Sequence, residues 1–138
     1  MERLDIIFKS IVAGAGAVTG HLFGGWDVFV QVLLIFVIVD YVTGIIAGGA
    51  NGKLNSKVGF RGILKKVMIF IIVAVAHWVD IVVGSTTGEE IAIFRDATIF
   101  FYVANELLSI IENAGEMGVP IPEKLMNAVE ILKGKKEE

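Results

Sequence analysis

The chain has 138 residues, 55% of them hydrophobic, and its mean hydropathy is +0.76. A soluble domain of this length has too little interior for so much apolar surface, so we expect lipid or a partner chain to cover the excess. The net charge of −3 argues against a nucleic-acid partner, because phosphate binding needs a cationic excess. The absence of cysteine excludes disulfides and thiolate metal sites, and the two histidines lie in separate segments, so we expect no metal site.

The first 25 residues are apolar and rich in glycine. Arg3 and Lys9 could begin a secretion signal, but only three residues separate Lys9 from the small residues that start at Ala13, which is too short for the apolar core of such a signal. Residues 10–26 contain a single ionisable group, His21. We therefore predict an uncleaved, membrane-embedded helix over about residues 6–24, with a helix lying in the membrane interface as the alternative.

Three later segments are long and apolar enough to cross a membrane: residues 28–47, 67–84 and 91–111. About 20 helical residues at about 1.5 Å each cross a hydrocarbon layer about 30 Å thick. Three segments cannot close a β-barrel, so helix is the state that satisfies their backbone groups in lipid. The sequence predicts an all-α integral membrane helical bundle over residues 1–118, with three transmembrane helices and the N-terminal membrane-embedded helix.

Asp40 is unusual because it lies well inside the first of these segments. One interpretation is a carboxyl group that is protonated, or paired with a base at the cytoplasmic boundary such as Lys65 or Lys66. The other is a group that responds to protons or to voltage, because ionisable residues within membrane helices are often functional.

The segment from 51 to 66 sets the orientation. It contains five bases and no acid, whereas residues 84–90 contain two acids and no base. The positive-inside rule places residues 51–66 and the C-terminus in the cytoplasm. We also expect the five bases to contact anionic lipid headgroups; they are Lys53, Lys57, Arg61, Lys65 and Lys66.

His77 and Asp80 stand three positions apart in the next segment. That spacing puts both on one helix face, so we expect an ion pair near the outer boundary of the membrane.

The third long segment carries polar residues on one face. Their spacings of 3, 4, 3, 4 and 3 follow a single helical stripe, flanked by Asp96 and Glu106. Charged groups in lipid are costly, so the stripe is either a static seam between helices or the lining of an aqueous opening. The stripe consists of Arg95, Thr98, Tyr102, Asn105, Ser109 and Glu112.

Glycines recur every four residues in two places, which lets helix backbones approach closely and favours helix association in lipid. They are Gly16, Gly20 and Gly24, and later Gly44 and Gly48.

Residues 119–138 differ from the rest. Pro120 and Pro122 break the preceding helix, residues 123–133 have the pattern of an amphipathic helix, and residues 135–138 form a charged tail. We expect this part to be cytoplasmic. The chain shows no phosphate-binding glycine loop and no set of catalytic residues, so we expect neither an enzyme nor a cofactor.

Four blocks resemble the toxin-secretion and phage-lysis holins of Gram-positive bacteria and their phages and prophages. The blocks stand in the family's order and cover most of residues 25–133: DYVTGIIAG (40–48), KLNSKVGFRGILKKV (53–67), AHWVD (76–80) and FFYVANELLSIIENAGEMGVPIPEKL (100–125).

The resemblance implies a small protein without a cofactor that accumulates in the host cytoplasmic membrane and forms homo-oligomers. Such proteins open lesions that depolarise the membrane and release an endolysin for cell lysis, and related members release clostridial toxins. Two other classes stay open: a small ion channel or transporter subunit, and a non-conducting antiholin or membrane adaptor.

Overall fold

The computed structural model describes residues 1–132, and within them the chain forms five α-helices and no strand. The predicted all-α fold is confirmed. The helices are α1 (Glu2–Phe23), α2 (Val28–Ala50), α3 (Ser56–Thr87), α4 (Ile93–Glu116) and α5 (Glu123–Leu132). The predicted charged tail, residues 135–138, lies outside the described residues.

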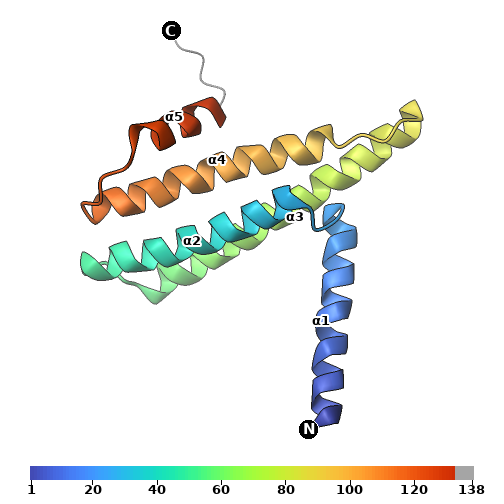
Figure 1. Ribbon diagram of the computed structural model, residues 1–138, viewed down its shortest axis with the longest axis horizontal. Coiled ribbons are helices and arrows are strands. Elements are labelled where there is room, and N and C mark those ends of the chain that lie inside the picture. Colours follow the sequence, from blue (N-terminus) through green and yellow to red (C-terminus); the bar gives the residue numbers. More distant parts are fainter. Residues whose placement is uncertain (133–138) are drawn as a thin grey trace.

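Three long helices form the body of the protein, and α1 projects from it at a steep angle (Figure 1). α4 packs along both α2 and α3, whereas α2 and α3 contact each other much less. α1 leaves the body near the start of α2 and contacts α3 near its own C-terminal end. α5 folds back beside α4, and its Val129 is buried.

Local sequence signals explain where most helices begin and end. The side chains of Asp27 and Asn55 accept hydrogen bonds from the first turns of α2 and α3, as N-cap residues do. Gly24 and Gly88 end α1 and α3 with φ values of 79° and 77°, a conformation that glycine adopts without strain.

The set of helices that are apolar enough to cross a membrane differs from the predicted set. By length and composition these are α1, α2 and α3. The predicted span 91–111 corresponds to α4, which is long enough but carries buried charges such as Arg95 and Glu106. Length and composition alone therefore do not mark α4 as a membrane-spanning helix.

The core of the body is a layer of aliphatic side chains between α2, α3 and α4. Four of them have no exposed surface. The buried cluster consists of Val30, Leu33, Val37, Val73, Ile99 and Val103. It fills the middle of the bundle and separates two groups of charged residues.

Candidate functional site

A central charge cluster joins the three long helices. The Nζ atom of Lys66 in α3 lies 2.6 Å from Oδ2 of Asp40 in α2 and 2.8 Å from Oε2 of Glu106 in α4. All three side chains are less than one-fifth exposed. Lys66 is one of the two bases named in the first interpretation of Asp40. One ammonium group here neutralises part of the charge of two carboxylates, and it ties α3 to both neighbours.

Asn113 completes the central cluster from the C-terminal part of α4. Its Nδ2 donates to Oδ1 of Asp40 at 3.0 Å and to Oγ1 of Thr43 at 2.9 Å. Both carboxylate oxygens of Asp40 are therefore hydrogen-bonded, one to Lys66 and one to Asn113. Sequence reasoning missed Asn113, although it falls four positions after Ser109 and so continues the polar face of α4.

A groove of about 550 Å³ runs from this cluster toward the link between α2 and α3. Side chains from α2, α3 and α4 line it, and Lys53 and Leu54 of the link close its end. Five predicted residues of α4 line this groove: Tyr102, Asn105, Glu106, Ser109 and Glu112. Water or ions could occupy a groove of this size and polarity.

The predicted polar stripe divides at its N-terminal end. Arg95 points into a second cluster at the other end of the bundle, and the hydroxyl of Thr98 donates to the carbonyl of Phe94 in its own helix. Neither residue lines the groove. Both residues lie near the end of the bundle that carries the α1–α2 link, and the groove does not extend to that end.

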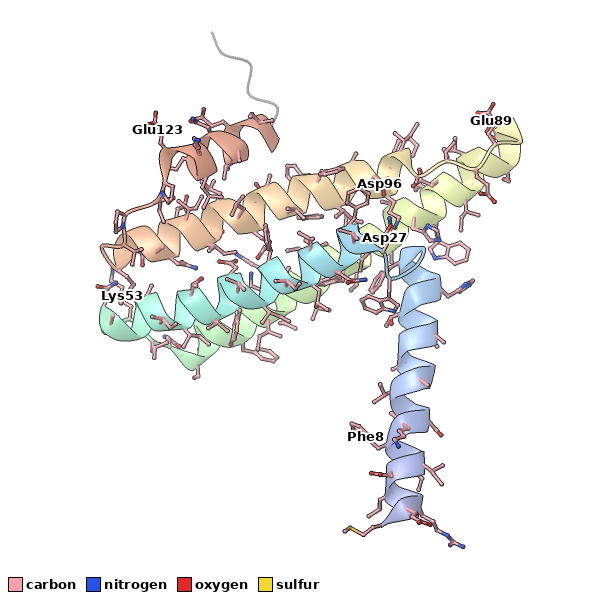
Figure 2. The ribbon with its side chains drawn as sticks, in the orientation of Figure 1. Phe8, Asp27, Lys53, Glu89, Asp96 and Glu123 are labelled. Atoms are coloured by element: carbon pink, nitrogen blue, oxygen red, sulfur yellow. The ribbon has the colours of Figure 1, made fainter. Side chains whose placement is uncertain are left out.

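The outer cluster centres on Arg95, which is only 4% exposed. Its two terminal nitrogens each lie 2.9 Å from one carboxylate oxygen of Asp27, which is a bidentate pair. The guanidinium also donates to Asp96 at 3.0 Å and to the carbonyl of Phe23 at the end of α1. The hydrogen bond from Arg95 holds the pKa of Asp27 below its ordinary value. Figure 2 shows Asp27 and Asp96 together where α1, α2 and α4 meet.

Asp80 does not pair with His77, contrary to our expectation. Its carboxylate is 1% exposed and accepts hydrogen bonds from the backbone N–H groups of Phe94 and Arg95, at 2.9 and 2.8 Å. These are free donors of the first turn of α4, whose own N-cap residue, Ala92, has no capping side chain. α3 thus supplies the cap for α4. His77 instead lies beside Gly24 and Trp78.

The glycines of α1 face no helix within the described chain. A Cβ atom on Gly16 would meet nothing within 4 Å, and one on Gly20 would meet only the ring of Trp26. In α2, Gly44 lies near Asn113 of α4, and Gly48 lies near Leu54 of the following link.

The basic segment is mostly helical. α3 begins at Ser56, so Lys57, Arg61 and Lys65 lie on its first turns at four-residue spacing, while Lys53 stays in the link. Figure 2 shows Lys53 and Glu89 at opposite ends of the bundle. The basic residues therefore lie at one end of the bundle and the acidic link at the other, and the predicted orientation in the membrane stays a prediction.

Within the described residues, no three histidine or acidic side chains are grouped in a way that could hold a metal ion.

A family model described as the bacteriophage holin family matches residues 17–134. The uncharacterized protein Lin0175 of Listeria innocua is 47% identical over 132 residues, covering 96% of this chain and 91% of that protein. Lmo0128 of Listeria monocytogenes is 45% identical, covering 98% and 93%. An uncharacterized 14.9 kDa protein of Clostridium perfringens is 38% identical, covering 99% of this chain and all of that protein. No solved structure matches the chain. The match over most of its length shows that this chain belongs to the bacteriophage holin family.

Proposed function

We propose that this protein is a holin that accumulates in the bacterial cytoplasmic membrane, oligomerises and opens large, non-specific lesions. The lesions depolarise the membrane and let an endolysin or a toxin cross it, which leads to lysis of the host cell. The observation that carries the proposal is the polar groove along α4, in a bundle whose neighbouring helices are apolar enough to cross a membrane. Membership of the holin family supports it.

The outer surface of the bundle fits a lipid environment. Ile35 and Ile46 of α2 and Val75 of α3 are each more than half exposed. A surface with many such aliphatic side chains would be unfavourable in water. Because α4 packs along α2 and α3, we infer that it crosses the membrane with them. The basic end with Lys53 then faces the cytoplasm, and so does the C-terminus.

In a single copy the charged groups at the inner end of the groove are paired and the centre of the bundle is closed. Lys66 offsets part of the charge of Asp40 and Glu106, and the aliphatic core fills the bundle beyond them. A charged group moved into lipid costs at least about 2.5–3.5 kcal/mol on insertion scales. Any rearrangement that opens the groove must therefore turn it toward water or toward other copies. Assembly of several copies around their grooves would create a water-filled lesion.

The test is a pair of matched variants of α4, each expressed in bacteria with the endolysin supplied. Ser109→Leu with Glu112→Leu removes two polar side chains from the α4 wall of the groove without changing the residues of the Lys66 ion pairs. Thr98→Leu changes a polar residue of the same helix outside the groove. We expect the groove variant to insert normally but to delay or abolish depolarisation and the escape of a large cytoplasmic protein. The Thr98 variant should follow the normal schedule.

The two readouts also separate the other classes of protein. Depolarisation of the unmodified protein without escape of a large protein would indicate a channel, and neither event would indicate a non-conducting adaptor. Either result would refute the proposal. Normal lysis by the groove variant would refute the role of the groove.

A further inference from the structure

The bundle leaves one helix position open. On the side that α4 does not line, α2 and α3 border a groove of about 250 Å³. Ile38 and Val42 of α2 and Ile63 and Val67 of α3 form much of its walls. The weak contact between α2 and α3 is what keeps this groove open. A helix placed there would lie opposite α4 and complete a four-helix bundle.

This groove continues to the base of α1. Val67 and Phe70 also line a second, larger groove of about 790 Å³, which lies along the outer face of α3. Leu22 and Phe23, the last two residues of α1, line that second groove, and every residue around it is apolar or aromatic. An apolar path therefore leads from the foot of α1 into the open position between α2 and α3.

Beyond Lys9, α1 is mostly apolar, yet it contacts another helix only near its C-terminal end. None of its residues is buried, and Phe8 projects far from the bundle in Figure 2. Its segment 10–20 contains no charged side chain. A helix that lies on a membrane surface needs a strongly polar face, which this segment does not offer. α1 is thus suited to the bilayer interior, where spanning helices run within about 40° of the membrane normal.

The junction between α1 and α2 contains two glycines, and a change of direction there must release the hydrogen bond from Arg95 to the carbonyl of Phe23. Gly24 and Gly25 both have positive φ angles, 79° and 111°, and glycine reaches other backbone angles at little cost. Trp26 covers one face of α1, since its Nε1 donates to the carbonyl of Gly16. Leu22, Ala15 and Ile11 lie on another face of α1 at helical spacing, and Trp26 does not cover that face.

If α1 turns parallel to α3, the apolar residues of α1 lie at the same level along the helix axis as the apolar residues of α3 that line the groove. Because Gly24 lies beside His77, Ser10 would stand level with Ile63, and Ala15 with Met68. The apolar part of α1 would then face the groove. Its charged first turns, up to Lys9, would stand level with the basic start of α3 at the membrane boundary.

We propose that the groove between α2 and α3 is the docking site of this chain's own α1, which turns about Gly24 and Gly25 in the bilayer and becomes the fourth helix of the bundle. The proposal concerns the resting protomer and does not depend on lesion formation.

The chain has no cysteine, so paired cysteines give a clean test in bacterial membranes. The first pair is Ala15→Cys with Val67→Cys, and the second is Ile11→Cys with Ile63→Cys. A protease site inserted between Gly52 and Lys53 separates α1–α2 from the rest of the chain. A disulfide forms only when the two Cα atoms are within about 7 Å. On oxidation, we expect both pairs to lose their free thiols and to hold the two protease fragments together.

The control is Ala15→Cys with Phe101→Cys, because Phe101 is exposed on α4, on the other side of the bundle. We expect the two protease fragments of this control to separate after oxidation. The proteins that carry the test pairs must match the unmodified protein in helix content and in extraction from the membrane. Fragments that separate in both test pairs, or that stay joined equally in the control, would overturn the proposal. Links between chains instead of within them, detected by mixing the single-cysteine proteins, would assign the groove to a second copy and would overturn it too.

Discussion

Removal of the ammonium group of Lys66 is the sharpest test of the central cluster. Lys66→Met keeps the length of the side chain and removes its charge. Asp40 and Glu106, 2.6 and 2.8 Å from the lost nitrogen, would then face each other with side chains only 13% and 8% exposed. Loss of one partner from a buried ion pair costs about 3–5 kcal/mol. We expect about 3 kcal/mol, because the groove admits some solvent, and that is a large part of a typical stability of about 5–15 kcal/mol.

The assay is denaturant unfolding of the detergent-solubilised protein at neutral pH, followed by helix content. Lys65→Met is the matched control, since Lys65 is the adjacent lysine and forms no ion pair within residues 1–132. The triple variant Asp40→Asn, Lys66→Met and Glu106→Gln removes every charge while keeping the shape. It should recover most of the lost stability, because replacing a whole buried pair is often nearly neutral. Equal unfolding of the Lys66 and Lys65 variants, or a triple variant as unstable as Lys66→Met, would refute the reasoning.

Three further predictions concern the outer cluster. Asp80→Ala removes the cap of α4 and should lower the unfolding free energy by about 1–2 kcal/mol, and a loss no larger than that of Asp5→Ala would contradict the capping role. Arg95→Lys cannot keep the bidentate pair with Asp27, so proteolysis of the link 24–27 should become faster, whereas unchanged proteolysis would show that the pair does not hold the link. The pKa of Asp27 is lowered from 3.8, so its contribution to stability is complete above that pH and is lost as the pH falls through the lower folded value. Unfolding measured from pH 5 downward should show this loss in the unmodified protein, and an equal loss in Asp27→Asn would disprove the assignment.

Hydropathy predicted the helices well because spanning a membrane constrains composition more strongly than any local signal does. The segments 28–47 and 67–84 lie inside α2 and α3, and the N-terminal segment is helical as expected. The ion pair between Asp40 and Lys66 could also be anticipated, because a carboxylate in an apolar segment needs a nearby base. Charge and burial together leave few candidates for such a partner.

Periodicity could not show what each residue faces. Tyr102, Asn105 and Ser109 of the predicted stripe line one groove, whereas Arg95 lies at the other end of the bundle among a different group of residues. Asp80 was assigned to the neighbour on its own helix, whereas its partners are backbone N–H groups from another helix. A helix cap cannot be predicted from local sequence when the carboxylate that accepts from the backbone N–H groups belongs to a distant segment. Periodicity alone does place Asn113 on the polar face of α4, but it could not show the partner, Asp40, which lies 73 positions away.

Under the proposed function, the spacing of the two charge clusters constrains how a lesion would open. Lys66 and Asp80 mark the two clusters on α3 and stand 14 positions apart, which is about 21 Å of helix. This is shorter than the roughly 30 Å of a bilayer's hydrocarbon layer, and aliphatic side chains such as Leu33 and Ile99 fill the space between. Each cluster ties α4 to other helices, so the core cannot separate along its whole length while both clusters hold. An opening that begins at the groove must break the Lys66 contacts first, whereas one that begins at the outer end must first release Arg95 from the α1–α2 link. Both ends have polar walls that can receive water, because a pocket of about 820 Å³ lined by Asp27, Asp80 and Arg95 lies at the outer end. The end at which opening starts therefore depends on which set of ion pairs breaks first.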